Sequence, residues 1–200
     1  MKIKFTLILL ACVISHISCI AQKEGNIWYF GNKAGVDFNQ ETPTALEDSK
    51  MNTAEGCATI ADAQGKLLFY TDGTTVWDKN HDPMANGQNL KGNSSSTQSA
   101  IVVRKPSSVF IYMVFTVDVI GSDGGLRLTE VDMRLNGGLG DVNAVKNNLI
   151  ENSTCEKVTV ISHKNERDHW LISQMYGQNK ARFHSYEITS SGVSSLPVFS

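Results

Sequence analysis

The stretch Glu55-Gly-Cys-Ala-Thr-Ile-Ala-Asp-Ala-Gln-Gly-Lys-Leu-Leu-Phe-Tyr-Thr71 carries the strongest structural signal in this 200-residue chain. It runs from a polar residue through a short apolar strand and a tight turn into an aromatic strand. The same order returns in residues 98–116 and again in residues 156–174. Copies of one β-hairpin along a chain are typical of radial or stacked β architectures. These three segments therefore predict a repeated antiparallel fold.

Strand signals dominate the remaining sequence, and helical periodicity is nearly absent. Residues 142–150 come closest to a helical pattern, but they are rich in Asn, so we expect a loop or a single turn there. Pairs such as Asp72-Gly73 and Gly137-Gly138 supply turn chemistry between the strands. Further strands are predicted at residues 27–30, 74–77, 126–133 and 182–188. Short antiparallel strands without helices predict an all-β domain.

The repeats favour a β-propeller over a β-sandwich, because a sandwich requires no repeat. Each repeat begins with small or β-branched residues, such as Ala58-Thr-Ile60, which suit the crowded innermost strand of a blade. The second strand is bulkier, with Phe69-Tyr70 in the first repeat, as packing between blades requires. The pattern therefore predicts a β-propeller-like arrangement of antiparallel blades.

The length of the chain limits the number of blades. One blade takes about 40–50 residues, so residues 22–200 correspond to about three to four blades. Closed rings usually have about 4–8 blades. We therefore expect a β-propeller-like domain over residues 22–200 that is truncated at its C-terminus. Such an incomplete ring needs missing blades or self-association to close.

Residues 1–21 have the composition of a secretory signal peptide. Lys2 and Lys4 precede the apolar residues 5–14, and Cys19-Ile-Ala21 offers a small-residue cleavage site. The apolar segment is too short to span a bilayer. A lipoprotein signal ending at Cys12 is the alternative, but cleavage there would leave an apolar stretch at the mature N-terminus. The sequence predicts export to the periplasm, the cell surface or the medium, with no membrane span in the mature chain.

The charge balance excludes one class of partner. Lys and Arg number 18 against 20 Asp and Glu, which gives a formal net charge of −2. The chain also has no run of basic residues. Nucleic-acid binding depends on a basic patch that contacts phosphates, so we expect no nucleic-acid partner. A glycan or a protein partner remains compatible with this composition.

Four longer motifs carry a family resemblance. They are Asn26-Ile-Trp-Tyr-Phe-Gly-Asn-Lys-Ala-Gly-Val-Asp-Phe38, Glu55-Gly-Cys-Ala-Thr-Ile-Ala-Asp62, Gly65-Lys-Leu-Leu-Phe-Tyr-Thr-Asp-Gly73 and Ser95-Ser-Thr-Gln-Ser-Ala-Ile101. They resemble the N-terminal region of large secreted proteins from gliding, Bacteroidetes-type bacteria, and the resemblance extends over about residues 26–192.

This resemblance implies a propeller-like region. In that family the region is usually followed by PKD-type immunoglobulin-like modules and a gliding-motility-associated C-terminal sorting domain, which the type IX secretion system reads. The present chain ends before any such module, and the resemblance implies no catalytic residues.

The repeats also place three polar residues at equivalent positions. Glu55, Gln98 and Glu156 each lie seven residues before the turn of their repeat. In a radial fold they would point together toward the mouth of the channel. Carboxylate and amide oxygens there could bind a cation or the hydroxyl groups of a sugar. The alternative is that each side chain accepts hydrogen bonds from the backbone of a neighbouring blade.

Motifs of common cofactor and catalytic sites are missing from the sequence. There is no Gly-x-Ser-x-Gly elbow, phosphate-binding loop or dinucleotide fingerprint, and the histidines lack metal-ligand spacing. We expect neither a cofactor nor a metal. Some side chains could still act on or bind a polysaccharide: the carboxylate pairs Asp72 with Asp78 and Asp118 with Asp132, and the aromatic rings of Trp28, Tyr70, Trp77 and Trp170. The alternatives are charged loop residues for the carboxylates and inter-blade core for the rings.

Two classes of function follow from the sequence. The first is a non-catalytic β-propeller module of an exported cell-surface or secreted protein that binds a glycan or a protein partner. The alternative is a polysaccharide-acting hydrolase or lyase with its site at the channel mouth. A third interpretation is a non-functional fragment of a longer secreted protein.

Overall fold

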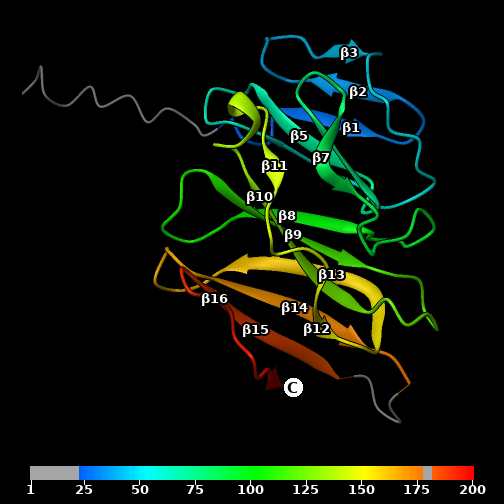
Figure 1. Ribbon diagram of the computed structural model, residues 1–200, viewed down its shortest axis with the longest axis vertical. Helices are drawn as coiled ribbons and strands as arrows, with labels where there is room; N and C mark the ends of the chain where they lie inside the picture. The colour runs from blue at the N-terminus through cyan, green and yellow to red at the C-terminus, as the bar shows by residue number, and fades with distance from the viewer. Residues whose placement is uncertain (1–22, 178–181) are drawn as a thin grey trace, which may run out of the picture.

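The computed structural model describes residues 23–177 and 182–200, so the predicted signal peptide lies outside the described residues. The described chain is all-β and consists of four antiparallel sheets. Figure 1 shows the sheets following one another along the long axis of the molecule in the order of the sequence. Within the described residues the four sheets do not form a closed ring, because the first and the last lie at opposite ends.

Each sheet is built from strands that are neighbours in the sequence. The first sheet holds β1 (Ile27–Phe30), β2 (Ala34–Asp37) and β3 (Thr44–Leu46). The second holds β4 (Ala58–Ala61), β5 (Leu67–Thr71), β6 (Thr75–Asp78) and β7 (Pro83–Gln88). The third holds β8 (Ala100–Arg104), β9 (Ile111–Val117), β10 (Leu126–Asp132), β11 (Asp141–Val142) and β12 (Asn148–Glu151). The fourth holds β13 (Thr154–Ser162), β14 (His169–Met175), β15 (Phe183–Thr189), β16 (Gly192–Val193) and β17 (Val198–Phe199).

The predicted hairpins and strands are confirmed. The three repeats form the antiparallel pairs β4–β5, β8–β9 and β13–β14. The strands predicted outside the repeats are present as β1, β6, β10 and β15, within one or two residues of the expected bounds. The expectation of a loop over residues 142–150 is wrong at both ends, because β11 and β12 pair with β10 there. A short 3-10 turn, Asn136–Gly138, precedes them.

The first strands of successive sheets lie against one another. β1 packs on β4, β4 on β8, and β8 on β13. They belong to four different sheets, and β4, β8 and β13 are each the edge strand of their own sheet. The strands with small or β-branched residues therefore meet in the middle of the molecule, one from each repeat.

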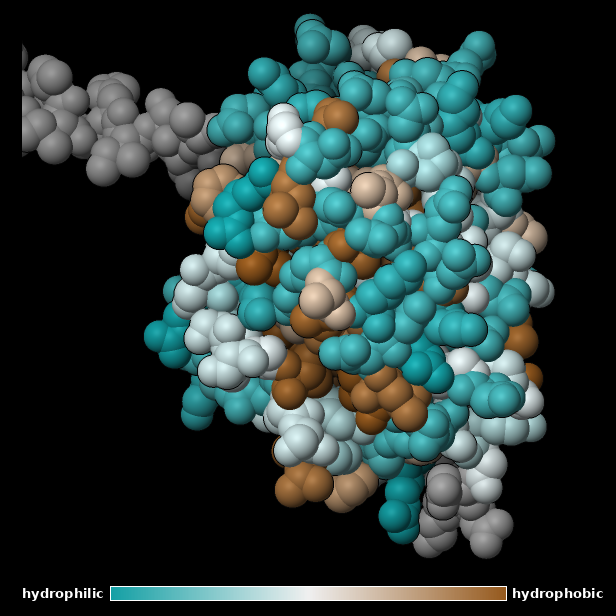
Figure 2. Space-filling model, viewed as in Figure 1, coloured by the Kyte–Doolittle hydropathy of each residue, from teal (hydrophilic) through white to brown (hydrophobic). Residues whose placement is uncertain are grey.

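Three apolar clusters fill the spaces between successive sheets. Alternating side chains of one strand enter different clusters, as the two-residue period of a strand requires. Tyr70 packs toward the first sheet and its neighbour Phe69 packs toward the third. Phe115 of β9 packs toward the fourth sheet. The second and third sheets are thus covered on both faces. Figure 2 shows further hydrophobic side chains gathered between the third and fourth sheets, near β12 and β16.

The two end sheets carry the same two-sided apolar pattern, but one face of each is exposed. Trp28 on β1 is 54% exposed and contacts the ring of Phe38 at 5.1 Å between centroids. At the other end, Ile161 of β13 is 50% exposed and Phe183 of β15 is 48% exposed. The strand register places Ile161 and Phe183 on one face of the fourth sheet.

Within the described residues, no helix has the length and apolar composition needed to cross a bilayer.

Candidate functional site

The three residues predicted to form a polar rim lie near the starts of the first strands. Glu55 precedes β4, Gln98 precedes β8, and Glu156 lies within β13. Glu55 and Gln98 are exposed and Glu156 is half-buried. Gln98 and Glu156 meet at the boundary between the third and fourth sheets. Glu55 makes no side-chain hydrogen bond to any other described residue, so the structure does not connect it to the other two.

Gln98 and Glu156 both accept hydrogen bonds from backbone N–H groups. Glu156 Oε2 accepts hydrogen bonds from Thr97 N and Thr97 Oγ1, each at 3.0 Å, and its Oε1 accepts one from Ile120 N at 3.0 Å. Gln98 Oε1 accepts a hydrogen bond from Val158 N at 3.2 Å. These contacts fit the structural alternative, in which the side chains bind the backbone of a neighbouring sheet. A role in holding a cation or a sugar stays a prediction.

A larger opening lies at the other end of the first strands, where the hairpin turns are. We name it the turn-end cleft. It has a volume of about 610 Å³ and lies at the end of β8 that leads into the β8–β9 turn. Its lining comes from the turns β8–β9 and β13–β14, from β4 and from the segment before β1: Glu24, Ile60, Val103, Arg104, Lys105, Pro106, Ser107, Ser108, Val109, Tyr112, Glu166, Arg167 and His169. Its volume lies within the range of about 300–1,000 Å³ typical of small-ligand sites.

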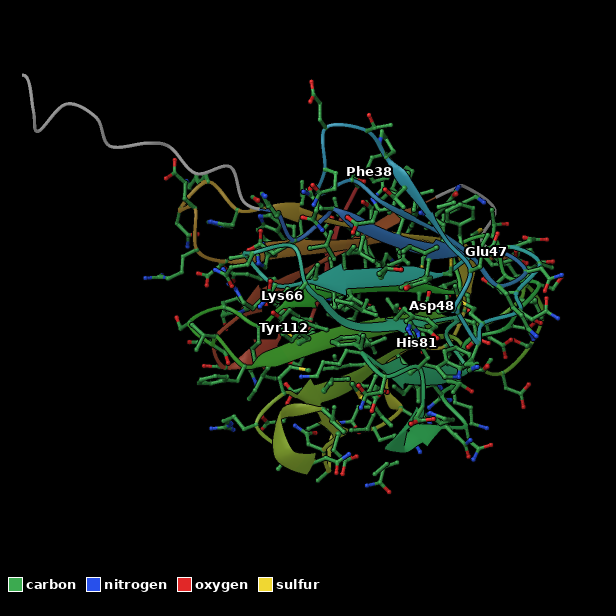
Figure 3. All side chains as sticks on the ribbon, turned by 90° about the horizontal axis from the view of Figure 1, so that it is seen from above. Phe38, Glu47, Asp48, Lys66, His81 and Tyr112 are labelled. Atoms are coloured by element: carbon green, nitrogen blue, oxygen red, sulfur yellow. The ribbon has the colours of Figure 1, made fainter. Side chains whose placement is uncertain are left out.

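Two polar side chains of the turn-end cleft stand opposite each other without a protein partner. Arg104 and Tyr112 are directly paired across β8 and β9, so their side chains lie on the same face. Neither side chain makes a hydrogen bond or ion pair with another described residue. Tyr112 is only 6% exposed, and burial raises the pKa of its hydroxyl. Figure 3 shows Tyr112 on the same side of the molecule as Lys66 of the β4–β5 turn.

The other cations of the turn-end cleft are already paired. Lys105 Nζ lies 2.8 Å from Glu130 Oε1, and that carboxylate is almost fully buried. Arg167 Nη2 lies 3.4 Å from Asp168 Oδ2. Arg104 is therefore the guanidinium in this cleft that is available to a ligand, within the part of the chain that the structure describes.

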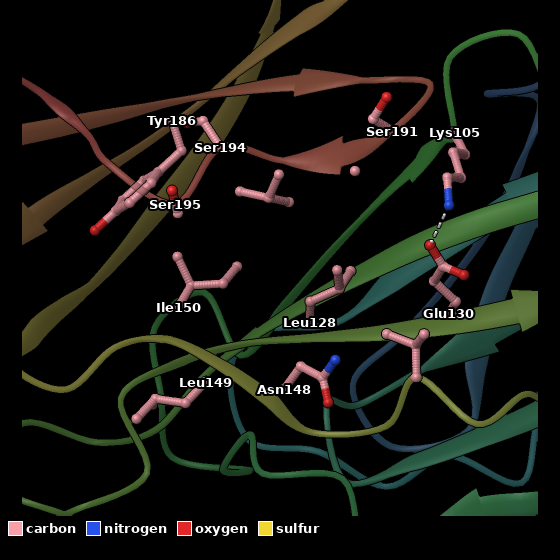
Figure 4. Close-up of a pocket in the computed structure, with 13 residues that line it drawn as sticks. Lys105, Leu128, Glu130, Asn148, Leu149, Ile150, Tyr186, Ser191, Ser194 and Ser195 are labelled. Carbon is pink, nitrogen blue, oxygen red and sulfur yellow. Dashed lines mark hydrogen bonds and ion pairs between the residues drawn. The ribbon is translucent and has the colours of Figure 1, made fainter.

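A second opening of about 460 Å³ lies between the third and fourth sheets (Figure 4). Apolar side chains such as Leu128 and Ile150 make up much of its lining. The Lys105–Glu130 ion pair lies at one side of it, and Asn143 Nδ2 donates a hydrogen bond to Glu130 Oε2 at 3.1 Å. The charged groups of this opening satisfy one another, and the rest of its lining combines apolar side chains with the hydroxyl groups of Tyr186 and three serines.

Two clusters of a carboxylate, a histidine and a tyrosine join neighbouring sheets. Asp48 accepts a hydrogen bond from Tyr29 Oη at 2.7 Å and lies 3.1 Å from His81 Nε2 (Figure 3). In the corresponding cluster between the third and fourth sheets, Glu151 Oε2 accepts a hydrogen bond from Tyr186 Oη at 3.0 Å and lies 3.1 Å from His184 Nδ1. In both clusters the residues come from different sheets or their connecting segments, so sequence reasoning had no signal for either.

The carboxylates considered for glycosidase chemistry hold turns together. Asp72 Oδ1 accepts hydrogen bonds from Thr74 N and Thr75 N, each at 2.8 Å. Asp78 accepts hydrogen bonds from Asn80 N and Asp82 N, and Asp118 accepts them from Val119 N and Asn93 Nδ2. Asp132 forms an ion pair with the guanidinium of Arg134. Among the described residues no group of three or more His, Cys, Asp or Glu side chains is placed to hold a metal ion.

The aromatic candidates divide between core and surface. Tyr70 and Trp77 are buried and stack on each other with ring centroids 5.3 Å apart. Trp170 is half-buried beneath the ring of His163, 5.6 Å away. Trp28 is the most exposed of the four predicted rings. Of these rings, Trp28 alone therefore presents a largely open surface to a ligand.

Comparisons with known protein families, with curated proteins and with solved structures give no match to this chain. The resemblance to secreted proteins of gliding bacteria therefore stays a prediction.

Proposed function

We propose that this chain is a non-catalytic, β-propeller-like binding module of an exported cell-surface or secreted protein, and that its turn-end cleft binds a glycan. The observation that carries the proposal is the pair Arg104 and Tyr112. These two polar side chains have no partner among the described residues and line a cleft of about 610 Å³. A binding site of this kind needs convergent polar groups beside apolar surface, and Ile60 and Val103 supply the apolar part.

The order of the sheets supports a propeller-like arrangement. Four sheets follow one another in sequence order, and each places its first strand against the next. The exposed apolar faces of the first and fourth sheets are suited to contact a further β-sheet, as the inner sheets contact one another. We infer that another sheet covers these faces in the functional state, and that the ring is incomplete without it.

A binding role fits the carboxylates better than hydrolysis does. Glycoside hydrolysis needs two carboxyl groups about 5–10 Å apart, one of them with a raised pKa. The candidate Asp side chains instead accept hydrogen bonds from the backbone of their own turns, or pair with an arginine. A protein partner is the other ligand considered. A concave cleft suits a small unit such as a sugar better than it suits the flat surface of a protein.

The proposal is tested by screening the purified protein against a panel of neutral and acidic glycans. We expect binding of at least one glycan and no release of reducing sugar on prolonged incubation. Release of reducing sugar would establish the hydrolase alternative. Binding of no glycan, with capture of a protein from the same cells through residues of the turn-end cleft, would replace the glycan by a protein partner.

Export is tested separately from ligand binding. The full chain, produced in a bacterium, is expected in the periplasm or the medium with Gln22 as its first residue. Retention of residues 1–21 on a protein that stays in the cytoplasm would contradict the predicted signal peptide.

A further inference from the structure

The chemistry of the turn-end cleft specifies its ligand more narrowly than a glycan in general. Arg104 presents five N–H donors in a planar fork, which matches the two oxygens of a carboxylate. Tyr112 faces it across the strand pair and offers an O–H group that can donate to, or accept from, a sugar hydroxyl. A ligand that satisfies both groups carries a carboxylate next to hydroxyl groups.

The acidic side chains of the cleft limit how much negative charge the ligand can carry. Glu24 and Glu166 line the same opening as Arg104. The paired cations Lys105 and Arg167 are neutralised by Glu130 and Asp168. A densely sulfated chain would meet these carboxylates and be repelled. A ligand with one carboxylate per sugar can place it at Arg104 and keep its uncharged hydroxyls toward Glu24 and Glu166.

The hydroxyl group of Tyr112 supplies a second reason to expect a polar ligand group. Tyr112 is more than nine-tenths buried, and its ring contacts Phe69 edge-on with the ring centroids 5.7 Å apart. Its hydroxyl has no protein partner among the described residues. The hydroxyl is open to the cleft, so a ligand oxygen can replace water as its hydrogen-bond partner. The apolar side chains of Ile60, Val103 and Val109 beside it can contact the C–H face of a sugar ring.

We propose that the turn-end cleft binds a uronic acid residue of an acidic polysaccharide, with the sugar carboxylate on Arg104 and a neighbouring hydroxyl on Tyr112. This inference rests on the proposed glycan-binding function and deepens it by naming the substrate class. Arg104 supplies the charge discrimination, and Tyr112 fixes the orientation of the ring.

The test compares two matched trisaccharides by isothermal titration calorimetry. Trigalacturonate and galactotriose differ at the sixth carbon, which is a carboxylate in the first and a hydroxymethyl group in the second. We expect trigalacturonate to bind more tightly. Arg104→Gln should weaken its binding at least about tenfold, because a hydrogen-bonded charge is lost. Tyr112→Phe should weaken it about two- to tenfold while leaving thermal unfolding unchanged.

Lys157→Gln serves as the matched charge-removing control. Lys157 is exposed and adjoins Glu156 on β13, away from the turn-end cleft, so its substitution should leave trigalacturonate binding unchanged. Equal losses in Lys157→Gln and Arg104→Gln would show that only net charge matters, and would overturn the assignment. Unchanged affinity in Arg104→Gln would place the ligand elsewhere and overturn it as well.

The neutral sugars separate failure of this inference from failure of the proposed function. If galactotriose binds as tightly as trigalacturonate, the uronate assignment is wrong and glycan binding stands. If trigalacturonate does not bind but a neutral glycan of the panel does, the uronate assignment is also wrong and glycan binding stands. If no glycan binds, the proposed function fails and this inference fails with it.

Discussion

Gln98 and Glu156 reach across the boundary between the third and fourth sheets in opposite directions. Gln98, just before β8, accepts a hydrogen bond from Val158 N of β13, and Glu156 of β13 accepts one from Thr97 N. The two sheets therefore exchange side-chain-to-backbone hydrogen bonds at neighbouring positions. Because Glu156 is charged, its bonds are the stronger of the two sets.

Removal of the Glu156 charge should destabilise the folded protein at neutral pH. Glu156→Gln keeps one acceptor oxygen but loses the charge that three donors share, so we expect the free energy of unfolding to fall by about 1 kcal/mol. Urea denaturation at pH 7 measures the change. Glu41→Gln, at an exposed loop position, is the control and should have no effect.

The effect of Glu156 should also depend on pH in a defined direction. The backbone hydrogen bond from Ile120, followed by that from Thr97, holds the pKa of Glu156 below its ordinary value of 4.5. A carboxyl with a lowered pKa in the folded state stabilises the fold above its ordinary pKa, and this stabilisation is lost as the pH falls through the folded-state value. The difference between wild type and Glu156→Gln should therefore shrink between pH 7 and pH 3. An equal difference at both pH values would contradict the assignment.

Two tyrosines that are both buried should respond differently to loss of the hydroxyl. Tyr186 donates a hydrogen bond to Glu151 at 3.0 Å, whereas the hydroxyl of Tyr112 has no partner among the described residues. Tyr186→Phe should lower the free energy of unfolding by about 1.5 kcal/mol, since it removes a bond to a carboxylate. Tyr112→Phe should change it by less than about 0.5 kcal/mol. A loss in Tyr112→Phe as large as that in Tyr186→Phe would show that the Tyr112 hydroxyl has a structural partner.

The hairpins could be predicted because their signals are local. Alternating apolar residues and a turn within a few positions specify β4–β5 without reference to the rest of the chain. The outer strands gave weaker signals. β7, for example, begins at Pro83 and contains Asn86-Gly87, residues that a strand pattern disfavours, and it forms because β6 provides a partner.

The candidate site could be predicted only in part, because it depends on how sheets meet. Equivalent spacing in the repeats found Gln98 and Glu156, which do meet across a sheet boundary, although they bind backbone there. Arg104 and Tyr112 gave no such signal. Their pairing follows from the register of β8 on β9, and the hydroxyl of Tyr112 lacks a partner because no described side chain or backbone group lies within hydrogen-bond distance of it. Neither property is visible in a single segment of sequence.

The cluster of Asp48, Tyr29 and His81 should contribute stability that is lost in acid. Burial works against ionisation of Asp48, but the hydrogen bond from Tyr29 and the nearby His81 outweigh it and hold the pKa of Asp48 below its ordinary value of 3.8. Its stabilisation is therefore present above that value and disappears as the pH falls below it. Asp48→Asn should cost about 0.5–1 kcal/mol at pH 7, because the carboxylate is largely exposed, and less at pH 3.

The adjacent residue Glu47 provides a control for the Asp48 measurement. It is exposed and makes no side-chain hydrogen bond to another described residue. Glu47→Gln should leave the urea midpoint unchanged at both pH values. If Glu47→Gln and Asp48→Asn behaved alike, the loss would come from general surface charge rather than from the contacts with Tyr29 and His81.

The exposed face of the fourth sheet should make the purified protein associate. Ile161 and Phe183 lie on one face of this sheet and are each about half exposed, although the opposite face of the same sheet is a packed core. In a solution of this chain alone, the apolar sheet faces available to cover them belong to other copies, so sedimentation velocity should show association that increases with concentration. The double variant Ile161→Lys with Phe183→Lys should stay monomeric, because charge on the face opposes its burial. The control is Leu135→Lys, at an exposed apolar position outside both end sheets, and it should associate like the wild type. A wild-type protein that is monomeric at every concentration would remove the support for a covering sheet.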